Sequence, residues 1–285
     1  MASEARPRTG PAGYGRSLTN YLRKYVVLPT YRPEQALSLV TADGVRLSGA
    51  RLHGPADAFA TFVLVHGFSH SSRTPGIYNF AHRLARHAHV VVPELRGHGR
   101  SEGCSTLGAD EPLDVDAAVA FSARVRPDLP IVTVGISLGG AAVLLHAGTH
   151  GGVAGVVGVS SPAWWGAWDT PATRRIERYA TTLAGRTFVN CVMRTRIADR
   201  CAGVPDARDV VGAIAPAFTL VVHDPVDHYF GREHPEAVYE WAKDPKALWW
   251  EEAAGHGTDL LTPSFADRLV AETRRRSVPG ASSSH

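Results

Sequence analysis

The stretch IVTVGISLGGAAVLL, residues 131–145, decides the fold that we expect for this chain. Its first four residues are apolar or β-branched and predict a buried strand, whereas the apolar run from residue 141 onward predicts a helix. Between them lies a G-x-S-x-G pattern centred on Ser137, which is typical of a tight strand-to-helix turn. Such a turn lifts the serine hydroxyl clear of the sheet and places it at a helix N-terminus. The alternative is a glycine-rich turn with an incidental serine.

Strand and helix signals alternate on both sides of this stretch. Residues 61–66 (TFVLVH) form a nearly continuous apolar run, as expected of a strand buried on both faces. Further strands are predicted at 36–41, 45–52, 90–93, 153–160, 219–222 and 247–251, with helices near 77–85, 110–121, 137–149, 235–241 and 264–275. This alternation predicts βαβ units, and therefore a mostly parallel sheet with helices on both faces.

The helix expected to begin near Asp110 carries a specific packing prediction. The Asp110 carboxylate is expected to cap the first turn of this helix. Its inward-facing side chains are expected to be Leu113, Ala117, Ala120 and Phe121.

Residues 163–216 interrupt the alternation of strands and helices. They contain no clear strand pattern, and about 50 residues is far more than a connection between two strands needs. We therefore expect an inserted, largely helical cap, too small to be an independent domain. The predicted organisation is an N-terminal extension at 1–35, one α/β domain at 36–276 that includes the cap at about 163–216, and a flexible tail at 277–285.

A short amphipathic helix is predicted within the N-terminal extension. Residues 18–26 place apolar side chains at helical spacing, with Arg23 and Lys24 outside that stripe. One interpretation is a basic anchor for a membrane surface. We favour a helix packed on the domain, because the basic residues are few.

Composition excludes several classes of function. The 30 basic and 27 acidic residues leave a formal charge of +3, and there is no long block of like charges, so we expect no nucleic-acid partner. The chain has neither a signal-peptide pattern nor an apolar stretch long enough for an integral membrane segment. Three cysteines favour a reducing compartment and a cytoplasmic location, with a pair between Cys191 and Cys201 left open. The oligomeric state is not predicted.

A reactive serine needs a histidine base, and that base needs an acid to orient it. In a sheet of this kind the chain order is serine, acid, histidine. His256 follows the last predicted strand and is flanked by glycines, so we expect it to be the base. We favour Asp227 as the acid, with Asp224 and Asp169 as alternatives.

Acyl transfer also needs two N–H donors for the oxyanion. We expect them to be the backbone of Leu138, directly after the serine, and that of Phe68, in the loop after the strand at 61–66. His66 and His70 have the spacing of a metal pair, but they lack a helical context and a carboxylate partner, so we expect no metal. The cluster of histidine and aspartate at 223–234 is explained better by the acid assignment than by a metal site.

Five segments of the chain together resemble the α/β-hydrolase family. They are HGF at 66–68, ELRGHGRSEG at 94–103, GISLGG at 135–140, HDPVDHYF at 223–230 and AGHG at 254–257. The likeness spans about residues 36–275 and is greatest to the bacterial esterase and serine-aminopeptidase-like branch. One departure is the acid motif, which reads HDPVD where family members usually have a glycine-containing GDAD-like sequence.

The resemblance implies an α/β-hydrolase fold, with an eight-stranded, mostly parallel sheet and a small helical cap. It implies that Ser137 is the nucleophile, Asp227 the acid and His256 the base, with Phe68 and Leu138 in the oxyanion hole. It implies neither a cofactor nor a metal.

The expected activity is hydrolysis of a carboxylic ester, or of a related acyl bond in a small molecule, through an acyl-enzyme on Ser137. Trp164, Trp165 and Trp168 are candidates for a substrate-binding acyl pocket, and packing of the cap explains them equally well. Alternative activities are those of a thioesterase, an acyltransferase, a peptidase or a cofactor-free perhydrolase. A non-catalytic binding module of the same fold is the alternative from another class.

Overall fold

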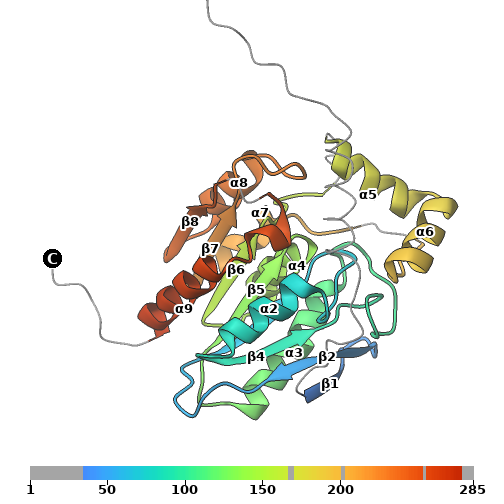
Figure 1. Ribbon diagram of the computed structural model, residues 1–285. Coiled ribbons are helices and arrows are strands. Elements are labelled where there is room, and N and C mark those ends of the chain that lie inside the picture. Colours follow the sequence, from blue (N-terminus) through green and yellow to red (C-terminus); the bar gives the residue numbers. More distant parts are fainter. Residues whose placement is uncertain (1–34, 166–169, 200–202, 253–254, 278–285) are drawn as a thin grey trace, which may run out of the picture.

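Eight strands form one sheet in the order β1-β2-β4-β3-β5-β6-β7-β8 (Figure 1). The computed structural model describes residues 35–165, 170–199, 203–252 and 255–277. The strands are β1 (Gln35–Val40), β2 (Arg46–Leu52), β3 (Thr61–Val65), β4 (His89–Pro93), β5 (Ile131–Ile136), β6 (Gly155–Val159), β7 (Phe218–His223) and β8 (Lys246–Trp250). Only the pairs β1·β2 and β2·β4 are antiparallel among these, so the prediction of a mostly parallel, eight-stranded sheet is confirmed.

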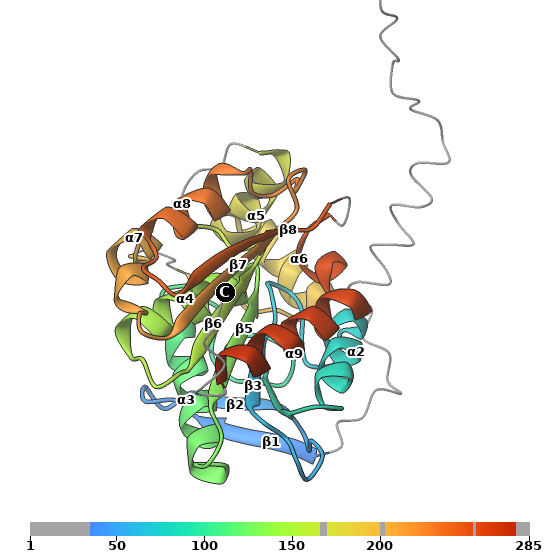
Figure 2. The ribbon, with the colours of Figure 1, turned by 90° about the vertical axis from the view of Figure 1, so that its left-hand side faces the viewer.

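Helices cover both faces of the sheet, as predicted. They are α2 (Pro75–Leu84), α3 (Glu111–Val125), α4 (Leu138–Thr149), α5 (Pro171–Thr181), α6 (Leu183–Met193), α7 (Ala207–Val210), α8 (Glu233–Trp241) and α9 (Pro263–Ser277), with short 3₁₀ helices η1 (Val211–Ala213) and η2 (Gly257–Leu260). Figure 2 shows α2 and α9 on one face and α3, α4, α7 and α8 on the other.

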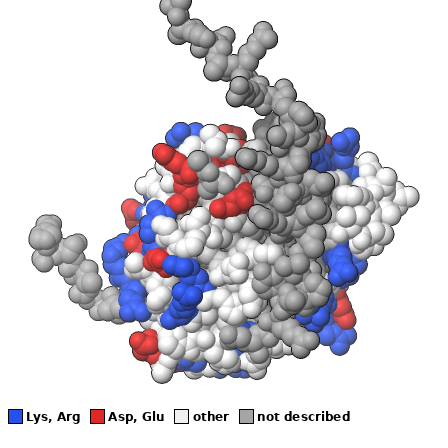
Figure 3. All heavy atoms as spheres, viewed as in Figure 1, with Lys and Arg blue, Asp and Glu red and all other residues white. Residues whose placement is uncertain are grey.

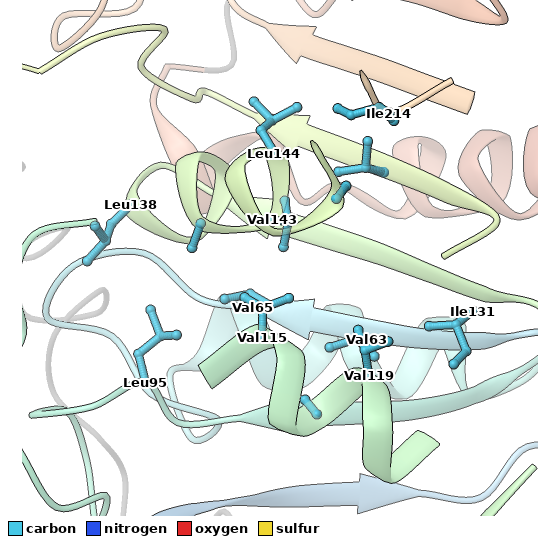
Figure 4. Packing of buried hydrophobic residues seen from close by; sticks show 14 of the residues in the cluster. Val63, Val65, Leu95, Val115, Val119, Ile131, Leu138, Val143, Leu144 and Ile214 are labelled. Atoms are coloured by element: carbon cyan, nitrogen blue, oxygen red, sulfur yellow. The ribbon is translucent and has the colours of Figure 1, made fainter. Parts of the chain in front are cut away.

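The alternation of side chains along β3 explains why its sequence is apolar throughout. Val63 and Val65 pack toward α3 and α4 (Figure 4), whereas Phe62 and Leu64 pack toward α2 and α9. All four are fully buried. Burying one such side chain contributes about 1.5–3 kcal/mol, so a central strand of a doubly covered sheet has no polar face.

One prediction about α3 is wrong, and a second holds only in part. Asp110 precedes the helix but makes no side-chain capping bond, and its carboxylate lies 3.6 Å from Nη1 of Arg96. The fully buried side of α3 carries Val115, Ala118 and Val119. Of the predicted side chains, Ala117 and Phe121 pack partly buried against the core, Leu113 is half-buried, and Ala120 is exposed. The helix is therefore rotated relative to the predicted face.

A buried ion pair accounts for that rotation. Nε and the backbone N–H of Arg96 donate to the two carboxylate oxygens of Asp114, at 2.8 and 2.7 Å, and Nη1 donates to Asp43 at 2.9 Å. The side chains of Arg96 and Asp114 are only 3% and 0% exposed. Because an uncompensated buried charge is costly, α3 must turn Asp114 inward toward Arg96.

The helices α5, α6 and α7 lie in the chain between β6 and β7. After α6 the chain returns along the loop that follows β4, where Thr195 and Ile197 form β-bridges with His98 and Ser105. The predicted N-terminal helix at 18–26 lies outside the described residues. Cys104 and Cys191 are free thiols, and Cys201 is also outside the described residues. None of the described helices combines the length and apolarity needed to cross a membrane.

We expect Asp114→Ala to lower the free energy of unfolding by about 3 kcal/mol, because it leaves Arg96 buried with an incomplete set of partners. Urea denaturation measures this change. Asp128→Ala is a matched control, because Asp128 pairs with Arg126 on the surface and its loss should have little effect. Equal effects of the two substitutions would contradict a dominant role for the buried pair.

Candidate active site

Ser137 occupies a strained turn between β5 and α4. Its backbone angles are φ 53° and ψ −115°, a conformation that residues with side chains rarely adopt. Its N–H donates to the carbonyl oxygen of Val159 at 2.8 Å, which ties the turn to β6. A side chain at Gly135 would overlap the Gly139 carbonyl oxygen, so β5 and α4 approach this closely only with glycine there. The predicted turn is therefore present, with the hydroxyl at the N-terminus of α4.

His256 and Asp227 lie in line with Ser137. Nε2 of His256 is 3.1 Å from Oγ of Ser137, and Nδ1 is 2.7 Å from Oδ2 of Asp227. Because an ionised carboxylate only accepts hydrogen bonds, Nδ1 carries the proton and Nε2 is left to accept from the serine hydroxyl. The structure thus brings the three residues predicted from chain order into one hydrogen-bonded row.

The Asp227 loop, residues 224–230, holds the carboxylate of Asp227 out of solvent. Oδ1 accepts from the N–H groups of Tyr229 at 2.7 Å and Phe230 at 3.3 Å, and the side chain is 0% exposed. Burial raises the pKa of Asp227, but the hydrogen bond and charge of His256, together with the Tyr229 N–H, lower it by more. The pKa is therefore below its usual value, and the carboxylate stays ionised beside the imidazole.

Asp224, the first alternative acid, does not contact the imidazole. Its carboxylate accepts from the N–H groups of Val226 at 2.8 Å and Gly255 at 2.5 Å. The other alternative, Asp169, lies outside the described residues. The geometry therefore favours Asp227 as the partner of His256.

The loop after β3 lies against the nucleophile turn. A methyl group on Gly67 would be 3.3 Å from Cβ of Ser137, so the neighbouring Phe68 backbone is close to the serine. Leu138 is the first residue of α4, where a helix leaves its N–H groups without intrahelical acceptors. Phe68 and Leu138 thus both lie next to residues at the serine turn, and their role as oxyanion donors stays a prediction.

His66 and His98 are fully buried next to the loop after β3. Nδ1 of His66 contacts the carbonyl oxygen of Gly67 at 2.8 Å, and Nε2 accepts from the N–H of Leu95 at 3.0 Å. Burial lowers the pKa of both histidines, so each is neutral. Within the described ranges, no group of three or more His, Cys, Asp or Glu side chains is placed to hold a metal ion.

Comparison with known proteins identifies the family. A model described as the alpha/beta hydrolase family matches residues 62–285. The chain belongs to the alpha/beta hydrolase family. A relative by sequence, the uncharacterized protein YfhR of Escherichia coli strain K12, is 25% identical over 221 residues, which are 75% of this chain and 70% of that protein.

Solved structures of other alpha/beta hydrolases share the fold. The Pyrococcus furiosus esterase Pf2001 superimposes with a TM-score of 0.70 at 20% identity, over 88% of this chain and 96% of that one. A thermophilic esterase from Thermogutta terrifontis, with malate bound, gives a TM-score of 0.62 at 19% identity, over 86% and 100% of the two chains.

The tryptophans predicted to bind substrate have different surroundings in this alpha/beta hydrolase. Trp164 stacks on His234, with ring centroids 4.3 Å apart, and its centroid lies 6.1 Å from that of Trp241. Trp165 packs partly buried beside Gly108, and Trp168 lies outside the described residues. The contacts of Trp164 and Trp165 favour packing, and a role in binding substrate stays a prediction.

Sequence reasoning missed the aromatic residues around the imidazole. The Tyr229 ring centroid is 4.2 Å from that of His256, and those of Phe230 and His228 are 5.7 and 5.9 Å away. The available signal was their position directly after Asp227, since a loop that returns an acid to a histidine must also bring its next residues there. These rings limit the access of water to the hydrogen bond between His256 and Asp227.

The lowered pKa of Asp227 predicts a pH-dependent contribution to stability. In the unfolded chain an aspartate titrates near pH 4. Since the folded pKa is lower, the stability due to the ionised form is present above that pH and is lost as the pH falls through the folded pKa. We expect Asp227→Asn to be less stable than the wild type at about pH 5, with the difference shrinking toward about pH 3. Urea denaturation across this range measures it, and a constant difference would contradict it.

Proposed function

We propose that this protein is a serine hydrolase that cleaves carboxylic esters, or related acyl bonds, through an acyl-enzyme on Ser137. The observation that carries this proposal is the hydrogen-bonded row of Ser137, His256 and Asp227, with distances of 3.1 and 2.7 Å. The row joins a hydroxyl, an imidazole base and a buried carboxylate in the order that nucleophilic catalysis requires.

The first half of the proposed reaction forms the acyl-enzyme. Oγ of Ser137 attacks the ester carbonyl carbon while Nε2 of His256 takes its proton, and Asp227 stabilises the resulting imidazolium. The carbonyl oxygen becomes an oxyanion, which the N–H groups of Leu138 and Phe68 bind. His256 then gives its proton to the alkoxide as the carbon–oxygen bond breaks, and the alcohol leaves.

The second half returns the enzyme to its starting state. Water gives a proton to Nε2 of His256 and attacks the acyl carbon, with the same N–H donors binding the oxyanion. The bond to Ser137 then breaks, Oγ recovers its proton from the imidazolium, and the carboxylic acid leaves. Each step uses side chains and backbone groups of the chain itself, without a metal or cofactor.

The surface charge is compatible with an uncharged small-molecule substrate. In Figure 3, basic side chains lie at both sides of the described part of the face and acidic ones mainly near its top, so neither sign covers it, in line with the formal charge of only +3. The names of the esterases from Pyrococcus furiosus and Thermogutta terrifontis support an ester as the substrate. A location in the cytoplasm belongs to the same proposal and is supported by the low cysteine content.

The nucleophile is tested with a fluorophosphonate probe and p-nitrophenyl esters. The wild type should be labelled on Ser137 and release p-nitrophenol, whereas Ser137→Ala should escape labelling and lose about 10⁴-fold or more in kcat. Ser122→Ala is a matched control, because Ser122 is a buried serine whose Oγ donates within α3 to Ala118. Folded wild-type protein that is neither labelled nor active would favour the binding-module alternative.

A substrate panel separates the enzymatic alternatives. We expect kcat/KM to be greatest for oxygen esters with short or medium acyl chains, and lower for matched thioesters and amides. Preference for thioesters would indicate a thioesterase or an acyltransferase on the same triad. Halogenation supported by hydrogen peroxide and a carboxylic acid would indicate the perhydrolase alternative.

A further inference from the structure

The backbone on both sides of His256 is held by side chains from distant parts of the chain. In the His256 loop, residues 255–259, the N–H of Gly255 donates to Oδ2 of Asp224 at 2.5 Å. The N–H of Gly257 donates to Oγ of Ser160 at 3.0 Å. The residue that carries the imidazole thus lies between two anchored peptide groups.

The two glycines beside His256 give this part of the loop wide conformational freedom. Gly255 and Gly257 have φ angles of 104° and 63°, in the region that residues with side chains rarely adopt. Glycine reaches these angles without strain, but it also has the most conformational freedom to lose on folding. Within the loop, the His256 N–H donates to Oδ2 of Asp259 at 3.4 Å. The two flanking glycines are held in addition by contacts from outside the loop.

Asp224 supplies such a contact through a fully buried carboxylate. Its residue is 0% exposed, Oδ2 accepts from Gly255, and Oδ1 accepts from the N–H of Val226 at 2.8 Å. One carboxylate therefore joins the Asp227 loop to the His256 loop. Because buried N–H groups need acceptors, this carboxylate ties the backbones of the two loops to each other.

Ser160 supplies the second contact from the end of β6. It is fully buried and has a φ of 49°, and its N–H donates to the carbonyl oxygen of Val222 in β7 at 2.9 Å. Strained backbone persists where surrounding contacts hold it. The hydroxyl that accepts from Gly257 is therefore attached to the sheet itself.

We propose that Asp224 and Ser160 are positioning residues, which fix the backbone of His256 so that its ring lies between Ser137 and Asp227. As a statement about catalysis this rests on the proposed function. Asp227 orients the imidazole ring, whereas Asp224 and Ser160 fix the position of the His256 backbone from which the ring extends. Both contacts are needed because the ring must reach a hydroxyl and a carboxylate together, at 3.1 and 2.7 Å.

The kinetic test compares Asp224→Ala with Asp224→Asn. The alanine variant loses both acceptors and should lower kcat about 100-fold, since a misplacement of about 1 Å has an effect of that size. Its KM should change less than about threefold, because no contact with substrate is removed. The asparagine variant keeps an oxygen for Gly255 and should retain about tenfold more activity than the alanine variant. Asp57→Ala, an exposed loop aspartate, is the charge-matched control.

A second measurement does not depend on turnover. In the wild type, proton NMR should show the His256 Nδ1–H as a low-field signal, assigned by its loss in His256→Gln. The amides of Gly255 and Gly257 should exchange slowly. Asp224→Ala should broaden or abolish the ring signal and speed the exchange of Gly255. Ser160→Ala should speed the exchange of Gly257, with the buried Ser122→Ala as its control.

The outcomes separate the two proposals. If the wild type hydrolyses nothing in the ester panel, the proposed function fails, and the NMR result alone decides whether Asp224 and Ser160 position His256. Wild-type kcat in a folded Asp224→Ala variant would overturn the inference. So would a variant that loses stability while its ring signal stays intact, because Asp224 would then support the fold only. If Asp224→Ala does not fold, the asparagine and Ser160 variants decide by the same two measurements.

Discussion

The left-handed backbone of Ser137 is the constraint on which the rest of the site depends. Its φ of 53° is imposed by the close packing of β5 against α4, and it directs the hydroxyl away from the sheet. The loop after β3 and the His256 loop both approach Ser137, so the rest of the site surrounds this residue. The strain is maintained because the surrounding strands are buried on both faces and cannot relax.

The site then depends on loops that follow the strands at the carboxyl edge of the sheet. The loops that carry Asp227 and His256 follow β7 and β8, and each leaves the sheet at its carboxyl edge. Side-chain oxygens hold their backbone N–H groups where regular secondary structure supplies no acceptor. Buried N–H groups without acceptors are costly, so the same bonds that stabilise these loops also determine the place of the imidazole.

Buried polar networks also govern the body of the molecule. Arg96 and Asp114 fix the rotation of α3, and Glu111 on the same helix accepts from Ser105 and Thr106. These groups lie among apolar side chains, so each is stable only with its partners complete. The fold is thus specified by apolar burial in the sheet and by a small number of charged contacts at its carboxyl edge.

The sequence by itself predicted the sheet and most of the candidate site. Apolar runs such as that of β3 predict strands because both faces are buried, and chain order pointed to Ser137 and His256 and favoured Asp227 over Asp224 and Asp169. Only the tertiary structure decided the buried face of α3 and the anchoring role of Asp224. In both cases the reason is physical. Contacts with a partner far away in the chain offset the cost of burying the carboxylate, and no local sequence pattern identifies that partner.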